Sequence, residues 1–214
     1  ILMNGAKVYD RRMDKTLGRA EIPWETVEAV IDFLEPLHCS VDCFQNDRGL
    51  MARKYYDRLE QYVTHPPSFA LVKRTREPVD DLKEAVLAGG GSVQKLQAYF
   101  PDLELRPKVM EQCKLVFPDL VQAISMPANL EFNAPDATKG NGLRTLCRCL
   151  GIDPREAAAF GDGTNDLSLL QEAGIGVAMA NGAPETLAAA DLTAPSNEED
   201  GVAQILSRWF PPNT

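Results

Sequence analysis

A seven-residue segment, Phe-Gly-Asp-Gly-Thr-Asn-Asp at positions 160–166, restricts the possible folds of this chain more than any other feature. Three alanines precede it, and the leucine-rich run 167–170 follows it. An apolar run that enters a Gly-Asp-Gly turn and continues as a helical pattern predicts a strand, a tight loop and the start of a helix. Open α/β sheets bind ligands at such places, beyond the carboxyl ends of their strands. We therefore expect the acidic loop, residues 162–166, to form part of a functional site.

The acidic loop carries oxygen ligands in a spacing that suits a metal ion. Asp162 and Asp166 lie four residues apart, and Asn165 stands beside the second aspartate. Mg²⁺ prefers oxygen ligands and often takes one or two carboxylates, leaving its other positions to water and phosphate. The sequence therefore predicts a Mg²⁺ site formed by Asp162 and Asp166. The alternative interpretation is an Asp-rich turn that caps the following helix, since Asp and Asn also favour such positions for structural reasons.

The composition is that of a globular protein without a surface for nucleic acid. The chain has 214 residues, 44% of them apolar, and a formal net charge of −9. Binding to a nucleic-acid duplex rests on Lys and Arg side chains that neutralise phosphates, so the excess of acidic residues argues against such a partner. No apolar run approaches the ~20 residues of a membrane span, and no signal peptide opens the chain. We therefore expect a cytoplasmic protein that does not bind membranes.

Soft metal ligands are few and poorly spaced. The chain has five cysteines and two histidines, and no cysteine pair has the Cys-x-x-Cys spacing of a zinc site. An odd number of cysteines in a cytosolic protein is best explained by reduced thiols. The sequence therefore favours an oxygen-ligand site over a zinc or imidazole-rich site.

The periodicity of apolar residues changes near Lys139. After it, strands and helices alternate about every ten to fifteen residues, which is typical of βαβ units on a parallel sheet. Here we expect strands at 157–160, 174–179 and 192–193, and helices at 142–150, 167–173, 185–190 and 201–209. Before it, the pattern predicts a mixed α+β region with strands at 6–10, 16–22, 40–44, 50–52, 93–100, 121–125 and 129–132, and helices at 24–37, 54–63, 78–87 and 106–117.

Two further residues are candidates to complete the site. Lys139 stands where an extended segment meets the first helix of the α/β half, and a lysine there can offer its charge to a phosphate. The alternative is a solvated lysine at a helix start. Asn181 follows the next apolar strand and could place its amide near the same loop, although an Asn-Gly turn explains it equally well.

Several segments, in order along the chain, resemble Cof-type phosphatases of cap class C2, which belong to the haloacid dehalogenase superfamily. They are the Lys-Gly pair at 139–140, the acidic loop with the preceding glycine, and the runs 174–183, 190–193 and 200–203. The Asn-Gly-Ala at positions 4–6 also resembles the family's Asn-Gly-Ala, which ends a core strand just before an inserted cap. The resemblance implies an α/β fold with a Rossmann-like parallel-sheet core at residues 1–5 and 134–214, incomplete at its N-terminus, and an α+β cap domain at residues 6–133.

The resemblance also implies an activity and roles for residues. Family members are Mg²⁺-dependent phosphomonoester hydrolases that act on small phosphorylated metabolites, usually sugar phosphates, through an aspartyl-phosphate intermediate. By position, Lys139 would hold the phosphoryl group and orient the nucleophile, Asp162 would bind Mg²⁺ directly, and Asp166 would do so directly or through water. Asn165 would contact the phosphate or the water shell of the metal. The remaining candidates for substrate contact are Asn4 and Asn181.

One departure from the family pattern concerns the nucleophile. The family's Asp-x-Asp-Gly-Thr motif and the phosphate-binding Ser/Thr before the cap are absent from these 214 residues. The first residues, Ile-Leu-Met, have the character of a strand end, so we expect a further segment with the nucleophile to precede Ile1. These 214 residues alone are therefore predicted not to turn over substrate. A smaller departure is the extra glycine in the Asn-Gly-Ala at positions 181–183.

Other interpretations remain open at the level of the sequence. P-type ATPases share a similar acidic loop, but they need membrane helices that this sequence lacks. A phosphosugar mutase of the same superfamily, or a truncated or non-catalytic protein that keeps the fold for binding, fits the same motifs. Asn46 and Arg48 are candidates for leaving-group contacts, with an ordinary exposed turn as the alternative. Neither the substrate nor the oligomeric state is specified by any motif.

Overall fold

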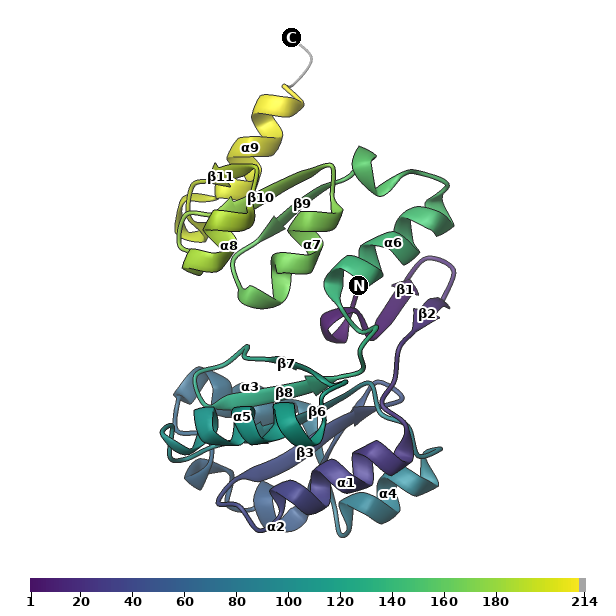
Figure 1. Cartoon of the computed structure of the whole chain (residues 1–214), viewed down its shortest axis with the longest axis vertical. Coiled ribbons are helices and arrows are strands. Elements are labelled where there is room, and N and C mark those ends of the chain that lie inside the picture. Colours follow the sequence, from purple (N-terminus) through teal and green to yellow (C-terminus); the bar gives the residue numbers. More distant parts are fainter. Residues whose placement is uncertain (212–214) are drawn as a thin grey trace. The chain divides into compact units, whose positions relative to one another are not determined.

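The computed structural model describes residues 1–211, and the chain divides into two compact units (Figure 1). The core unit consists of Ile1–Gly18 with Thr138–Thr214, and the inserted unit consists of Arg19–Ala137. The sequence placed the boundaries after residue 5 and before residue 134. The structure instead groups the hairpin that follows residue 5 with the core unit, because that hairpin packs beside the first long helix of the core unit.

The core unit contains the predicted parallel sheet. Its strands are β9 (Ala158–Gly161), β10 (Ile175–Met179) and β11 (Leu192–Ala194), with both neighbouring pairs parallel and β10 in the centre. Each strand is followed by a helix, as βαβ units require. These helices, with the one that precedes β9, are α6 (Lys139–Leu150), α7 (Leu167–Glu172), α8 (Pro184–Ala189) and α9 (Gly201–Trp209).

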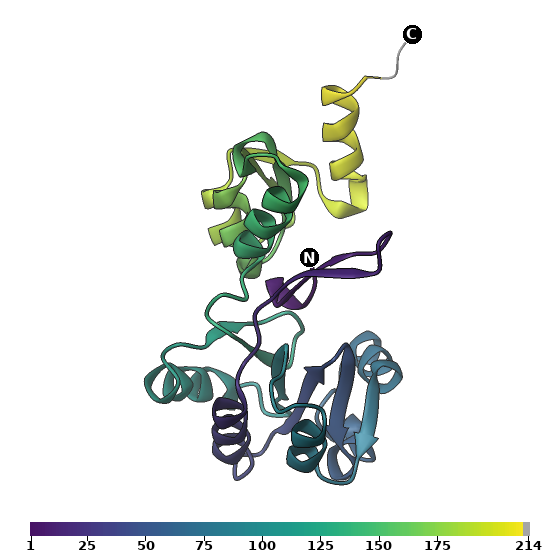
Figure 2. The ribbon, with the colours of Figure 1, turned by 90° about the vertical axis from the view of Figure 1, so that its right-hand side faces the viewer.

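Both faces of this sheet are covered by helices. On one face, Leu143 and Cys147 of α6 and Leu170 of α7 pack with Ala159 of β9. On the other face, Val177 of β10 belongs to a cluster that includes the buried side of α9. Figure 2 shows α9 on the opposite side of the sheet from α6 and α7. A sheet covered on both faces explains why its strands are apolar runs without alternation.

The first residues of the chain also belong to the core unit. A single 3-10 turn, Met3–Gly5, precedes a two-stranded sheet of β1 (Lys7–Asp10) and β2 (Lys15–Arg19). The turn packs against the start of α6, where a Cβ on Gly5 would lie 2.0 Å from the Thr138 carbonyl oxygen. Gly5 has a φ of 106°, so only glycine fits this place without strain.

The inserted unit is built on a six-stranded mixed sheet in the order β5-β4-β3-β6-β8-β7. Only β4 and β5 pair in parallel, so the predicted α+β character is confirmed. The strands are β3 (Ser40–Gln45), β4 (Arg48–Ala52), β5 (Arg76–Val79), β6 (Lys95–Tyr99), β7 (Val121–Ala123) and β8 (Asn129–Asn133). The helices are α1 (Trp24–Leu34), α2 (Arg53–Tyr56), α3 (Pro66–Thr75), α4 (Leu82–Ala88) and α5 (Leu105–Val116).

The prediction from sequence fails at three places in the inserted unit, for identifiable reasons. The helix expected at 54–63 is a short α2 followed by a 3-10 turn at Leu59–Gln61, because Arg58 has non-helical angles (φ −122°, ψ 28°). No helix was expected at 66–75, but the prolines at 66–67 begin α3, where their missing N–H groups cost nothing. Strand β5, at the edge of the sheet, was not predicted because Pro78 lies within it, and edge strands tolerate proline.

Candidate active site

Asp166 organises the acidic loop through its carboxylate. Its Oδ2 atom accepts hydrogen bonds from the backbone N–H groups of Asp162 and Gly163, both at 3.0 Å. Its Oδ1 atom forms an ion pair with Lys139 Nζ. The Asp166 side chain is buried, and both of its oxygens already have donors. The Gly at 161 permits this packing, because a Cβ there would lie 2.4 Å from Asp166 Cβ.

Lys139 reaches the loop because two helices begin side by side. Thr138 caps α6 by accepting a hydrogen bond from the Asn141 N–H at 3.1 Å, so Lys139 is the first residue of the helix. Gly140 donates its N–H to Ser168 Oγ of α7 at 3.1 Å. A Cβ on Gly140 would lie 2.4 Å from the Ser168 carbonyl oxygen. This close approach of α6 to α7 brings together Lys139 and Asp166, which are 27 positions apart in the chain.

Asp162 has a different environment in the same loop. Its side chain is exposed and makes no hydrogen bond or ion pair within residues 1–211. Its backbone is held from both sides, because its N–H donates to Asp166 and its carbonyl accepts from the Ala183 N–H at 2.8 Å. The Asp162 carboxylate is therefore available to a ligand, while its backbone is held in place.

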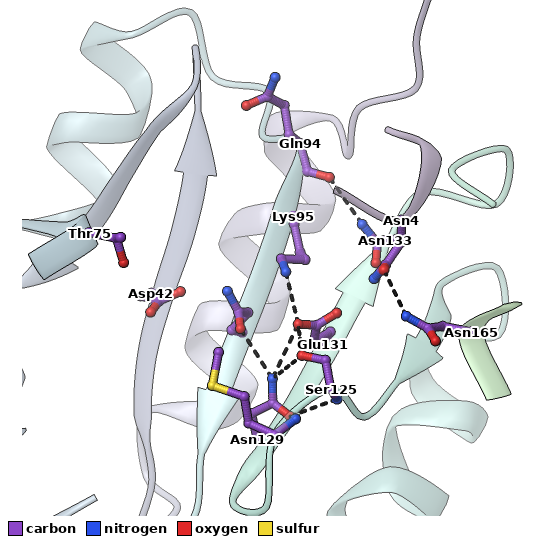
Figure 3. Close-up of polar contacts among 12 residues, drawn as sticks. Asn4, Asp42, Thr75, Gln94, Lys95, Ser125, Asn129, Glu131, Asn133 and Asn165 are labelled. Carbon is purple, nitrogen blue, oxygen red and sulfur yellow. Dashed lines mark hydrogen bonds and ion pairs between the residues drawn. The ribbon is translucent and has the colours of Figure 1, made fainter. Parts of the chain in front are cut away.

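The side-chain amide of Asn165 contacts the first residues of the chain. Its Nδ2 atom donates to Asn4 Oδ1 at 3.2 Å, as the dashed line in Figure 3 shows. Both side chains are half-buried. The structure thus joins two of the predicted substrate-binding residues to each other.

Asn181 has a structural partner outside the acidic loop. Its Oδ1 atom accepts a hydrogen bond from the Asn197 N–H at 3.1 Å. The extra glycine beside it, Gly182, lies between two backbone oxygens, since a Cβ there would be 2.9 Å from the Met179 carbonyl and 3.1 Å from that of Asp162. The loop at 181–183 therefore supports Asp162 through its backbone, and no hydrogen bond within residues 1–211 links the Asn181 side chain to the acidic loop.

The two candidates in the inserted unit also have partners of their own. Arg48 forms an exposed ion pair with Glu77 of β5 at 2.5 Å. Asn46 donates to the Gly89 carbonyl at 2.9 Å across a turn in which it has a φ of 50°. These contacts agree with the alternative of an ordinary exposed turn.

A polar network on one face of the inserted sheet was not predicted. Because side chains alternate along strands, Asp42, Lys95 and Glu131 share one face of β3, β6 and β8. Arg76 donates to Asp42 at 2.7 Å, and Lys95 pairs with Glu131 at 2.8 Å. Figure 3 shows the bonds that converge on Glu131. The sequence feature that could have predicted this network is the polar residue at every second position of these strands.

The chemistry of the core unit fits a Mg²⁺ ion bound mainly by water and phosphate. No group of three or more Asp, Glu, His or Cys side chains within the described residues is placed to hold a metal. Asp162 alone offers an unengaged carboxylate in the acidic loop. Mg²⁺ commonly keeps several waters and takes one or two carboxylates besides substrate phosphate, so this donor set is adequate as part of such a site.

Comparison with known proteins gives matches along almost the whole chain. A family model described as haloacid dehalogenase-like hydrolase matches residues 1–206. The Bacillus subtilis protein named "Putative phosphatase YxeH" is 29% identical to this chain over 212 residues. These residues are 96% of this chain and 73% of YxeH. The 5-amino-6-(5-phospho-D-ribitylamino)uracil phosphatase YbjI of Escherichia coli is 34% identical over 49% of this chain and 39% of its own length.

One similar protein is named as an endoribonuclease and not as a phosphatase. The chloroplastic endoribonuclease YBEY of Arabidopsis thaliana is 48% identical over 80 residues, which are 37% of this chain but only 14% of that protein. The chain thus spans well under half of YBEY and YbjI and about three quarters of YxeH. The name of YBEY therefore carries no inference about the activity of this chain.

Solved structures show the same fold. A haloacid dehalogenase-like hydrolase from Bacteroides thetaiotaomicron has a TM-score of 0.78 and 25% identity, covering 97% of this chain and 74% of that one. A sugar phosphatase of subclass IIB in the haloacid dehalogenase superfamily has a TM-score of 0.78 with 24% identity and the same coverage. These matches confirm the predicted α/β fold class. In addition, no helix in residues 1–211 has the length and apolar character to cross a membrane.

Proposed function

Because this chain belongs to the haloacid dehalogenase-like hydrolases, as its motifs predicted, we propose that it acts as a Mg²⁺-dependent phosphatase on a small phosphorylated metabolite. The observation that carries the proposal is the ion pair of Lys139 with Asp166, which brings a cation to the loop that also carries the free carboxylate of Asp162. Phosphoryl transfer depends mainly on positioning and on neutralising the charge of the phosphate. The names of YxeH and YbjI, which both contain the word phosphatase, support this enzyme class.

The residues of the core unit have distinct parts in this proposal. Lys139 binds a phosphate oxygen, and Asp166 orients Lys139 while holding the loop closed. Asp162 holds the metal, which when bound neutralises phosphate charge and orients the phosphoryl group. Asp166 Oδ2 already accepts two backbone N–H groups, so Oδ1, the partner of Lys139, is the oxygen that would contact the metal, directly or through water.

The nucleophile is proposed to lie outside these 214 residues. No two aspartates in the chain have the Asp-x-Asp spacing of the family motif. In addition, the chain spans 73% of YxeH, and within residues 1–211 strand β9 pairs with a neighbour on one side only. A carboxylate nucleophile on a strand beside β9 would face the acidic loop, since the carboxyl ends of parallel strands meet at one edge of a sheet.

Binding of metal and phosphate tests the proposed site without requiring turnover. Mn²⁺ should bind the 214-residue chain, and Asp162→Asn should weaken that binding by tenfold or more, because the one free carboxylate of the loop is lost. In the presence of Mg²⁺, Lys139→Met should abolish binding of inorganic phosphate. The matched control is Asp119→Asn, which removes an exposed carboxylate of the inserted unit. Unchanged Mn²⁺ affinity in Asp162→Asn would refute the assignment.

A second candidate function is a non-catalytic binding protein, which the absent Asp-x-Asp pair favours. Both candidates predict no turnover of a generic phosphomonoester by the 214 residues with Mg²⁺. Robust turnover would show that the nucleophile lies within them. The intact mass and N-terminal sequence of the natural protein separate the two candidates, because a mass above 23.5 kDa with an upstream Asp-x-Asp supports the enzyme. A phosphosugar mutase would share this motif and differ in transferring the phosphoryl group to a sugar.

A further inference from the structure

The turn that contains Asn4 has an unusual backbone. Three consecutive residues have positive φ angles: Met3 (50°), Asn4 (58°) and Gly5 (106°). Positive φ is unfavourable for residues other than glycine and least so for Asn and Asp, and it persists where surrounding contacts hold it. The contacts of this turn therefore indicate which parts of the structure keep its backbone in this conformation.

The turn contacts both parts of the candidate active site. Gly5 packs against the backbone of Thr138, the residue that caps α6 immediately before Lys139. Asn4 accepts the hydrogen bond from Asn165 of the acidic loop. One turn at the beginning of the chain thus touches the helix start that carries the lysine and the loop that carries the carboxylates.

The contact with Asn4 determines which way the Asn165 amide faces. An amide side chain has an NH2 group that donates and an oxygen that accepts, so a partner for the NH2 group also sets the direction of the oxygen. Asn165 Nδ2 is turned toward Asn4. Asn165 Oδ1 lies on the other side, over Gly163, where an added Cβ on that glycine would be 2.6 Å from it.

We propose that Asn4 is a positioning residue that acts through Asn165. Its side-chain oxygen holds the Asn165 amide so that Asn165 Oδ1 faces the acidic loop and accepts hydrogen bonds from the water shell of the metal. Asn165 then serves the metal rather than the phosphate, and Asn4 contacts neither. The inference rests on the proposed metal site and adds to it an outer hydrogen bond that crosses from the N-terminal turn to the loop.

Substitutions at Asn4 can separate the effect of its side-chain oxygen from the effect of its backbone conformation. Asn4→Gly keeps the positive φ, which glycine adopts readily, and removes the acceptor. Asn4→Asp keeps both the acceptor and a residue type that tolerates this conformation. The control is Asn46→Gly, since Asn46 also has a positive φ and donates to a backbone carbonyl, but in the inserted unit.

Mn²⁺ affinity, measured by titration calorimetry on the 214-residue chain, is the first readout. Asn4→Gly should weaken Mn²⁺ binding about three- to tenfold, because one hydrogen bond that orients an outer ligand is lost. Asn4→Asp should bind at least as tightly as the parent, and Asn46→Gly should match it. In an Asn165→Ala background, Asn4→Gly should have no further effect. An unchanged affinity in Asn4→Gly, or an equal loss in the Asn165→Ala background, would overturn the inference.

The side-chain NH2 signal of Asn165 in the NMR spectrum is the second readout and needs no metal. A hydrogen-bonded amide exchanges its protons slowly, so Asn4→Gly should speed this exchange while Asn4→Asp preserves it. If the parent chain binds no Mn²⁺, the proposed metal site fails, yet this exchange still decides the coupling between the two residues. Equal exchange in the parent and in Asn4→Gly would refute the coupling even where Mn²⁺ binds.

Discussion

The two aspartates of the acidic loop should differ sharply in their effect on stability, although the sequence presents them as a pair. Asp166→Ala removes the acceptor of two backbone N–H groups and the partner of Lys139. Asp162→Ala removes a side chain that is exposed and has no hydrogen-bond partner within residues 1–211. The comparison therefore isolates the contacts of one carboxylate within a single loop.

The expected magnitude follows from these contacts. Each hydrogen bond to a charged acceptor contributes about 1.5–3 kcal/mol. The ion pair adds about 1 kcal/mol at most, because 28% of the Lys139 side chain is exposed. Water replaces part of the lost bonds in this surface loop, so we expect Asp166→Ala to lower the free energy of unfolding by about 3 kcal/mol. Asp162→Ala should change it by less than about 0.5 kcal/mol.

Urea unfolding followed by tryptophan fluorescence can measure this difference in the core unit alone. Each unit contains one tryptophan, Trp209 in α9 of the core unit and Trp24 in α1 of the inserted unit. In a Trp24→Phe background the signal of Trp209 reports the core unit, even if the two units unfold in separate transitions. Equal losses for the two alanine variants, or a change below about 0.5 kcal/mol for Asp166→Ala, would refute the assigned role of Asp166.

Two further predictions concern other parts of the molecule. Arg76→Met should lower the free energy of unfolding of the inserted unit by about 3–5 kcal/mol, because it leaves the buried carboxylate of Asp42 unpaired. Arg48→Met, at an exposed ion pair, should cost less than about 1 kcal/mol, and equal losses in urea unfolding would contradict this account. Burial, with a smaller effect of Cys113, raises the pKa of Cys39 from 9.0 to about 12, so this thiol ionises first in the unfolded chain. Stability should therefore fall as the pH rises from about 9 toward 12, and the fall should be less steep in Cys39→Ala; identical slopes would contradict the prediction.

Local features of the sequence were sufficient for the part of the core unit that begins at Lys139. An apolar run, a Gly-Asp-Gly turn and a leucine-rich helix follow one another at 157–170, and the structure has β9, the acidic loop and α7 at these places. The alternation of strand and helix predicted the parallel sheet, because neighbouring βαβ units pair in chain order. Family motifs in the same region agree with the family model and with the solved structures.

The inserted unit was harder to predict because its short elements depend on tertiary packing. Leu59 and Val63 have helical spacing, but both enter one buried cluster from a 3-10 turn and the segment after it. The prolines at 66–67 have the same chemistry at the start of a helix as after the end of one, and only the following packing of α3 distinguishes the two cases. Periodicity over ten residues does not contain this information.

For the candidate site, the sequence by itself determined which residue types are present and that one loop carries Asp162, Asn165 and Asp166. The tertiary structure decided how they are used. Asp166 is occupied because a lysine 27 residues away and two backbone N–H groups converge on it, whereas Asp162 stays free. Asn165 is oriented by Asn4, 161 residues earlier in the chain. Spacing along a chain specifies residues on one element, but a hydrogen bond between distant residues forms only when the packing of whole helices and turns brings its two atoms together.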